Sequence, residues 1–181
     1  LAKSRGARRV VPLAVSGARV AAITDLAQCN VYEVDSTSPE RIRLLAGLEA
    51  SETTPRTAFC ALDRNRLFVA NRRRTMYDVQ AALSQLTRRW TENQDDSFLT
   101  PIQLNGETIV QIRRRGGIEG ALIEGASAAD GKVQWTTHGA APVVAIIASE
   151  GGRPAAALTG DGRLYSLNDA AFTSNQVLPP S

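Results

Sequence analysis

Residues 101–112 read Pro-Ile-Gln-Leu-Asn-Gly-Glu-Thr-Ile-Val-Gln-Ile. A proline opens a short apolar run, an Asn-Gly pair follows, and a second run rich in β-branched residues begins at Thr108. Asn105-Gly106 is a strong hairpin signal because both residues tolerate a positive φ. Proline is tolerated at the first residue of a strand, where no ladder N–H is needed. The stretch therefore predicts two antiparallel strands joined by a tight turn.

The same arrangement recurs along the chain. Prolines that open β-rich runs stand at intervals of 43, 46 and 41 residues: Pro12, Pro55, Pro101 and Pro142. Turn signals follow the other three: Ser16-Gly17, Asp63-Arg64-Asn65 and Glu150-Gly151-Gly152. Each turn leads to a second predicted strand, at 19–23, 67–70, 108–112 and 154–158. Internal repeats of this kind indicate a repeated supersecondary unit.

Two further markers keep the period. A third predicted strand carries Tyr32, Tyr77 or Tyr165, with Leu122-Ile123-Glu124 in the third copy, and the intervals through Ile123 are 45, 46 and 42 residues. A fourth strand is predicted to end in Trp90 and in Trp135, the only tryptophans of the chain. Four short strands in a period in the low forties are typical of a β-propeller blade.

A helix over residues 78–90 is the main alternative. Apolar residues fall there at helical spacing: Val79, Ala82, Leu83, Leu86 and Trp90. Trp90 has the same place in its repeat as Trp135, which follows a turn at Gly131. This shared register favours a turn and a strand for residues 78–90 instead of a helix.

We therefore predict an all-β fold of about four four-stranded antiparallel blades, at about 11–50, 54–96, 97–139 and 140–178. These form one partial β-propeller domain spanning residues 1–181. Four blades leave an open edge unless the ring closes. The expectation is half of a larger, eight-bladed ring completed by additional blades or a second copy, or else a small propeller. The chain begins at Leu1, which we interpret as an excised piece of a longer protein or a processed form.

The composition and charge of the chain limit the classes of function that it can have. Hydrophobic residues make up 43% and charged residues 22%, as in ordinary globular proteins. A net charge of +3 is too small to imply nucleic-acid binding. The longest apolar stretch, Ala140–Ala148, is too short to span a bilayer, and no signal peptide is evident. Cys29 and Cys60 do not make a disulfide framework and are expected to be buried thiols.

Two stretches resemble the pyrroloquinoline-quinone-like (PQQ-like) repeat family. Residues 130–135, Asp-Gly-Lys-Val-Gln-Trp, resemble the end of its repeat, A-x-D-x-x-T-G-K-x-x-W. Residues 160–167, Gly-Asp-Gly-Arg-Leu-Tyr-Ser-Leu, resemble its D-G-x-[LV]-Y-A-L. The resemblance spans about residues 11–168, but Ser127 replaces the usual Asp, Asp130 replaces the Thr, and the first and fourth copies lack the Trp.

The resemblance implies a propeller, commonly of eight blades. The family includes quinoprotein dehydrogenases and scaffold proteins that bind no quinone. Because its members are commonly found in the bacterial cell envelope, the resemblance implies that location. The quinone and calcium sites of the dehydrogenases are not matched residue by residue, so we predict no catalytic residue, cofactor or metal. His138, the only histidine, is expected in a blade-to-blade connection. We predict a non-catalytic interaction or scaffold module with a protein partner. The alternatives are a fragment of a PQQ-dependent oxidoreductase, and a propeller hydrolase or lyase that uses scattered acids and arginines.

Two arginine runs are the candidate binding residues: Arg72, Arg73, Arg74, Arg113, Arg114 and Arg115. Each run is interpreted as following the second strand of its blade, which would place both on one face of adjacent blades. Clustered guanidinium groups favour an acidic protein, a carboxylate or a polyanion. The alternative is a set of edge charges that block aggregation. A counter-charge nearby, such as Asp95, Asp96 or Glu119, would make the cluster structural instead. Trp90 and Trp135 are predicted to be largely buried between blades.

Overall fold

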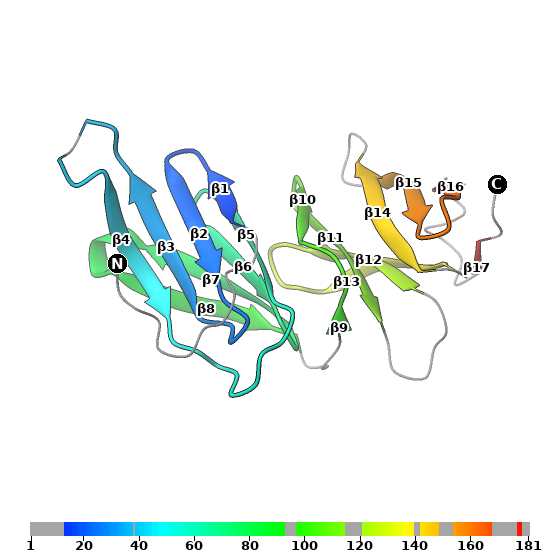
Figure 1. The fold of residues 1–181 in the computed structure, drawn as a ribbon, viewed down its shortest axis with the longest axis horizontal. Coiled ribbons are helices and arrows are strands. Elements are labelled where there is room, and N and C mark those ends of the chain that lie inside the picture. Colours follow the sequence, from blue (N-terminus) through cyan, green and yellow to red (C-terminus); the bar gives the residue numbers. More distant parts are fainter. Residues whose placement is uncertain are drawn as a thin grey trace. The chain divides into compact units, whose positions relative to one another are not determined.

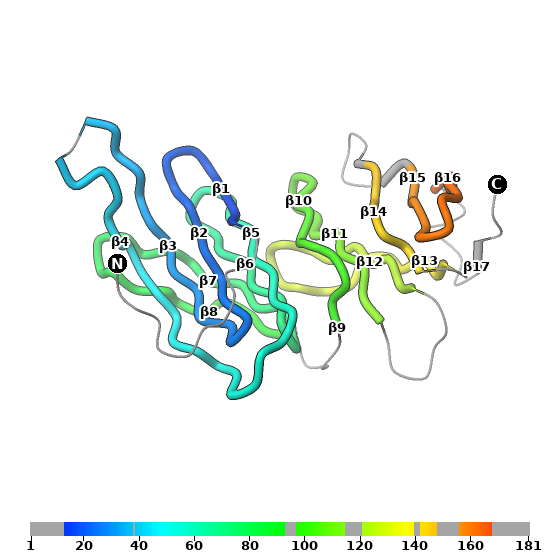
Figure 2. The backbone as a smooth tube through the Cα atoms, in the orientation of Figure 1, coloured from blue at the N-terminus to red at the C-terminus, as the bar shows by residue number. Residues whose placement is uncertain are grey.

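The computed structural model describes residues 13–37, 39–92, 97–114, 121–139, 142–148, 154–167 and 177–178. These residues fall into two compact units, Leu1–Asn93 and Gln94–Ser181. Both units are built from mainly antiparallel β-sheets, as Figures 1 and 2 show, and the predicted all-β fold is confirmed.

The first unit contains two four-stranded sheets with the simple orders β1-β2-β3-β4 and β5-β6-β7-β8. The first sheet, blade 1, consists of β1 (Ala14–Ser16), β2 (Arg19–Ile23), β3 (Cys29–Val34) and β4 (Ile42–Leu48). The second, blade 2, consists of β5 (Phe59–Asp63), β6 (Arg66–Ala70), β7 (Arg74–Gln80) and β8 (Gln85–Thr91). Up-and-down order with short turns is that of a propeller blade.

The first hairpins of blades 1 and 2 turn at the predicted places and are tied together. Gly17 and Arg64 take the positive φ values of 58° and 50° that such tight turns need. The Arg64 backbone N–H donates to Ser16 Oγ at 3.0 Å, and Arg19 Nη1 donates to the Arg64 carbonyl at 3.2 Å. The two blades therefore share hydrogen bonds at their turns as well as an apolar core.

That core lies between blades 1 and 2, which Figure 1 draws one in front of the other. Alternate residues of each strand point into it, because successive side chains of a strand leave opposite faces. Blade 1 contributes Ala21, Ile23, Cys29, Val31 and Leu45, and blade 2 contributes Ala58, Cys60, Leu62, Leu67, Val69 and Val79. The core is aliphatic, as the low aromatic content of 5% requires.

The helical alternative for residues 78–90 is wrong. The segment ends β7, makes a single 3-10 turn, η1 (Ala81–Leu83), and continues as β8. Val79 is buried while Leu83 is 69% exposed, so the apolar residues do not share one face. No helix in the described part of the chain is long and apolar enough to cross a membrane.

The second unit holds blades 3 and 4. Blade 3 consists of β10 (Gln103–Asn105), β11 (Thr108–Arg114), β12 (Ala121–Ser127) and β13 (Val133–Gly139), with β9 (Ser97–Phe98) also paired to β11. Blade 4 has three described strands, β14 (Val143–Ala148), β15 (Pro154–Thr159) and β16 (Leu164–Ser166). The last described strand, β17 (Val177–Leu178), pairs in parallel with β13 of blade 3 rather than with blade 4. The predicted turn at Glu150-Gly151-Gly152 lies outside the described residues.

The fourth strand of blades 1 to 3 carries a β-bulge at one position. Ala46, Trp90 and Trp135 each directly follow the bulged residue of their strand, and they pair with Val31, Met76 and Gly125. The two tryptophans thus occupy equivalent pairing positions in their strands. The strands do not end at them, however, because β8 runs to Thr91 and β13 to Gly139. This extension also places His138 within β13, not in a connection.

The same pairings correct one sequence alignment. Tyr32 pairs with Val20, Tyr77 with Leu67, and the equivalent residue of blade 3 is Ala126, paired with Ile109. The expected Ile123 lies three residues away because the β11–β12 hairpin extends beyond the corresponding turn of blade 2.

Candidate functional site

Each blade has two faces, which the blade packing distinguishes. Residues such as Ala21 and Val31 of blade 1 point toward blade 2, and we call this the forward face. The opposite, backward face of blade 2 carries Leu67, which packs on blade 1. The second unit follows the same rule: Val110 on the forward face of blade 3 shares a core with Ala157 on the backward face of blade 4.

The backward face of blade 1 carries most of the exposed large hydrophobic side chains described in the first unit. A row of paired residues crosses its four strands: Val15, Val20, Tyr32 and Leu44. Its large exposed hydrophobic side chains are Leu13 at 61%, Val15 at 65%, Val34 at 41%, Ile42 at 65% and Leu44 at 52%. Contiguous exposed apolar side chains of this kind mark interaction sites. We call this set the blade 1 patch.

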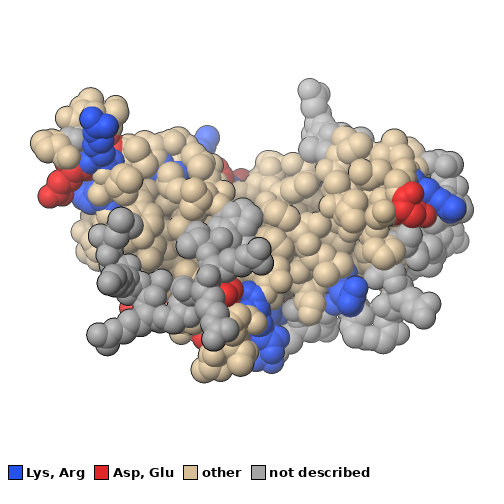
Figure 3. Space-filling model, in the orientation of Figure 1, with Lys and Arg blue, Asp and Glu red and all other residues tan. Residues whose placement is uncertain are grey.

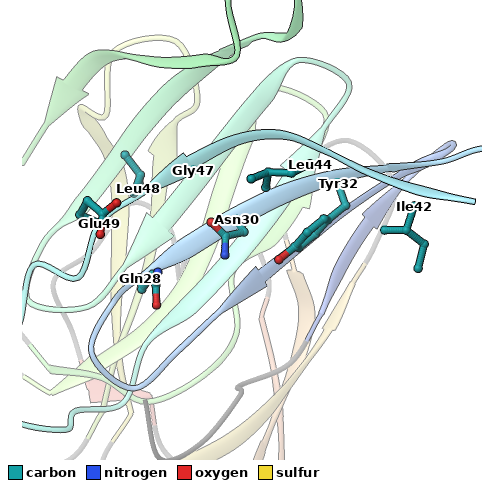
Figure 4. Close-up of a pocket in the computed structure, with 8 residues that line it drawn as sticks. All are labelled: Gln28, Asn30, Tyr32, Ile42, Leu44, Gly47, Leu48 and Glu49. Atoms are coloured by element: carbon teal, nitrogen blue, oxygen red, sulfur yellow. The ribbon is translucent and has the colours of Figure 1, made fainter. Parts of the chain in front are cut away.

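A groove of about 580 Å³ runs along β3 and β4 within this face. Its lining residues are Gln28, Asn30, Tyr32, Ile42, Leu44, Gly47, Leu48 and Glu49. Figure 4 shows Tyr32 beside Ile42 toward one end, and Gln28 and Glu49 toward the other. The groove is therefore apolar at the end with Tyr32 and Ile42 and polar from Asn30 to Gln28 and Glu49, a composition suited to burying a protein surface.

Asn30 and Gly47 shape the middle of this groove. A Cβ atom on Gly47 would lie 2.5 Å from Asn30 Oδ1, so the amide occupies the space that a side chain at position 47 would take. The two residues pair across β3 and β4. In Figure 3, described side chains over the middle of blade 1 are uncharged, and charged side chains gather toward the edges.

The first arginine run is divided between a turn and a buried ion pair. Arg74 is the first residue of β7, and its side chain is 1% exposed. Its Nε donates to Glu92 Oε1 at 2.8 Å, and Nη2 contacts the same oxygen. Arg72 and Arg73 are exposed at the β6–β7 turn. Asn71 of the same turn donates to Ser51 Oγ at 3.4 Å, which links the turn to the connection after blade 1.

The second run does not follow the second strand but ends it. Arg113 and Arg114 are the last residues of β11, so Arg113 corresponds to Asn71 of blade 2 and not to an arginine. Arg113 is 8% exposed at its side chain and forms an ion pair with Glu124, which is 1% exposed. Arg114 is exposed. Arg115 and the expected counter-charges Asp95, Asp96 and Glu119 lie outside the described residues.

The two tryptophans differ in burial. Trp135 is 8% exposed and lies across the backbone of Gly125, where a Cβ atom would meet Trp135 Cε2 at 2.0 Å. Trp90 is half-buried, with its ring centroid 6.3 Å from that of Phe68. Sequence reasoning missed Gly125, although a glycine opposite a tryptophan is a signal of close packing.

Titratable groups give little sign of a reactive centre in the described part of the chain. No cluster of three or more His, Cys, Asp or Glu residues there is placed to hold a metal ion. Cys29 and Cys60 are buried thiols that are not joined in a disulfide, as expected. The neighbouring Cys60 thiol and burial raise the pKa of Cys29, which favours the protonated thiol over the reactive thiolate.

Comparison with solved structures decides the fold family. The chain aligns with the computationally designed Ika4 protein at a TM-score of 0.63 and 12% identity, covering 91% of this chain and 95% of that one. It aligns with BamB from Moraxella catarrhalis at a TM-score of 0.57 and 16% identity, covering 90% of this chain and 45% of BamB. The fold is that of a β-propeller. The WD40 domain of SCAP from fission yeast aligns at 0.52 and 14% identity, covering 95% of this chain and 44% of that one.

These similarities to solved structures establish the blade architecture and no more specific relationship. No family model and no curated protein sequence matches the chain. The chain spans less than half the length of BamB and of the WD40 domain. The PQQ-like assignment of the repeats therefore remains a prediction from their motifs.

Proposed function

We propose that this chain is a non-catalytic propeller module that binds protein through the blade 1 patch. The observation that carries the proposal is the exposure of five large apolar side chains on one side of a four-stranded sheet. Leaving them in water forgoes roughly 25 cal/mol per Å² of apolar surface, so a protein that covers them gains binding energy. The propeller neighbours are consistent with a protein-interaction role.

The test compares two exposed leucines. Leu44→Glu places a carboxylate in the patch, and Leu83→Glu places one on the 69% exposed residue of η1. Protein captured by the immobilised chain should be lost with Leu44→Glu and kept with Leu83→Glu. Equal capture by both variants would remove the patch as the binding site.

A quinone-binding and dye-reduction assay tests the catalytic alternative. A PQQ-dependent oxidoreductase would bind the quinone with calcium and reduce a dye, whereas the proposed module changes neither quinone absorbance nor dye. Calcium-dependent dye reduction by the chain would overturn the non-catalytic assignment. A cell-envelope location and a PQQ-like ancestry are proposals that rest on the repeat motifs alone.

The exposed arginines of each unit, Arg72 and Arg73 in the first and Arg114 in the second, are further proposed contacts for an acidic protein or polyanion. Only Arg72, Arg73 and Arg114 among the described members of the runs are exposed, since Arg74 and Arg113 are buried in ion pairs. The proposed contacts therefore involve these three exposed arginines and not all six arginines of the two runs.

A further inference from the structure

The backward face of blade 1 is built as a surface that receives another blade. Its residues occupy the same pairing positions as residues of blade 2 that are buried against blade 1. Val15 pairs with Val20 as Leu62 pairs with Leu67. Leu62 is 6% exposed and Leu67 0%, whereas Val15 is 65% exposed. The position is apolar in both blades. Within the first unit it is covered only in blade 2, where Leu62 packs against blade 1.

Tyr32 extends the equivalence to the third strand. It pairs with Val20 as Tyr77 pairs with Leu67. Tyr77 packs against the core between blades 1 and 2, and its burial raises its pKa. Tyr32 instead lines the open groove. The matched positions indicate that the groove is fitted to a forward blade face.

A forward face of this kind is exposed at the other end of the chain. On blade 4, Leu158 pairs with Leu164 as Ala21 pairs with Val31 on blade 1. Ala21 and Val31 are both 0% exposed under blade 2, whereas Leu164 is 48% exposed. Ile147 on the same side is 49% exposed. Among the described residues of each unit, the receiving face of blade 1 and the forward face of blade 4 are thus left uncovered, and the two faces match in apolar character.

Resting on the proposed function, we propose that the occupant of the blade 1 patch is blade 4 of a second copy of this chain, so that two copies close one ring of blades. The length of the chain agrees with this partner. It covers 45% of BamB and 44% of the WD40 domain, so two copies supply about nine-tenths of either. A contact of this type is heterologous, and with two copies it closes with two identical interfaces.

The experiment measures the mass of the purified chain in solution. Light scattering after gel filtration should give twice 19.4 kDa. Leu44→Glu and Leu164→Glu should each weaken dimerisation at least about 100-fold, because each buries an unpaired carboxylate at both interfaces. Leu83→Glu should leave the dimer intact. Circular dichroism checks that each variant remains folded.

Mixing the two monomeric variants provides a test that simple misfolding cannot mimic. A heterodimer of the Leu44→Glu and Leu164→Glu chains has one interface with both changes and one with neither, so mixing should restore a species of twice the chain mass. No restoration, or a wild-type chain that is monomeric, would overturn the proposal. A monomeric chain that still captures another protein through the blade 1 patch would leave the proposed function standing and remove only this partner.

Discussion

Arg113 on β11 and Glu124 on β12 form an ion pair inside blade 3, with side chains 8% and 1% exposed. They sit diagonally across the two strands, since Arg113 pairs with Leu122 and Glu124 with Gln111. A buried charge is tolerated when its partner is held in place, and removing one partner leaves the other uncompensated. This arginine is therefore part of the framework of the blade.

Glu124→Gln should lower the free energy of unfolding by about 3–5 kcal/mol, because it removes the Glu124 counter-charge from the buried Arg113 guanidinium. Urea unfolding followed by fluorescence measures the change. The control is Asp78→Asn, which breaks the surface pair of Asp78 with Arg89, whose side chains are 26% and 57% exposed. That change should cost no more than about 1 kcal/mol. Equal costs for the two variants would contradict a framework role for Glu124.

Gly125→Ala should destabilise blade 3 by about 1–3 kcal/mol, because its Cβ would overlap the Trp135 ring and push it from the sheet. The fluorescence of the folded protein should also change as Trp135 moves. Gly160→Ala is the matched control, since its Cβ would meet Val144 Cγ1 at an ordinary 3.6 Å. A stable Gly125→Ala protein with unchanged fluorescence would show that Trp135 does not lie over Gly125.

The repeat of proline, hairpin and tyrosine was enough to predict four sets of strands, because each copy repeats the same local turn chemistry. The alignment of the third strands failed where the β11–β12 hairpin lengthens, because there the residue equivalent to Tyr77 is Ala126 and not the expected Ile123. A change in hairpin length leaves the strand pattern itself intact, so periodicity alone does not reveal it.

The candidate sites were less accessible to sequence reasoning. A run of three arginines does not show which member is buried, because the counter-charges Glu92 and Glu124 lie 18 and 11 residues away from their partners. The blade 1 patch was missed because its apolar positions look like those of any blade. It becomes visible only when Val15 is compared with the buried Leu62.

Cys29 should stay unreactive toward Ellman's reagent at pH 8 until the chain unfolds, because it is buried and its pKa is raised by the Cys60 thiol and by burial. The pH dependence has a definite sign. Since the folded chain keeps this proton to a higher pH than the unfolded chain, the Cys29 contribution to stability is complete below the ordinary thiol pKa and is lost as the pH rises through the folded value.

The Cys29 contribution to the urea midpoint should therefore fall above about pH 9, the ordinary thiol range, and the Cys29→Ala variant should lose this part of the pH dependence. Cys60→Ala should also bring the Cys29 pKa closer to its usual range, because it removes the largest cause of the shift. Rapid modification of Cys29 in the native protein, or identical alkaline profiles for wild type and Cys29→Ala, would contradict this account.

The exposed arginines should contribute to binding of anionic polymers, and the buried ones should not. Changing Arg73 and Arg114 together to Glu should lower affinity for heparin and flatten its salt dependence, since fewer screened contacts form. Changing Arg43 and Arg163 to Glu is the matched control, because both are exposed at 62% and 59% of their side chains. Either pair changes the net charge by the same amount, from +3 to −1, since each replacement subtracts two charges. Equal loss of affinity in the two double variants would show that heparin responds to net charge alone, and would leave Arg73 and Arg114 as ordinary solvated charges.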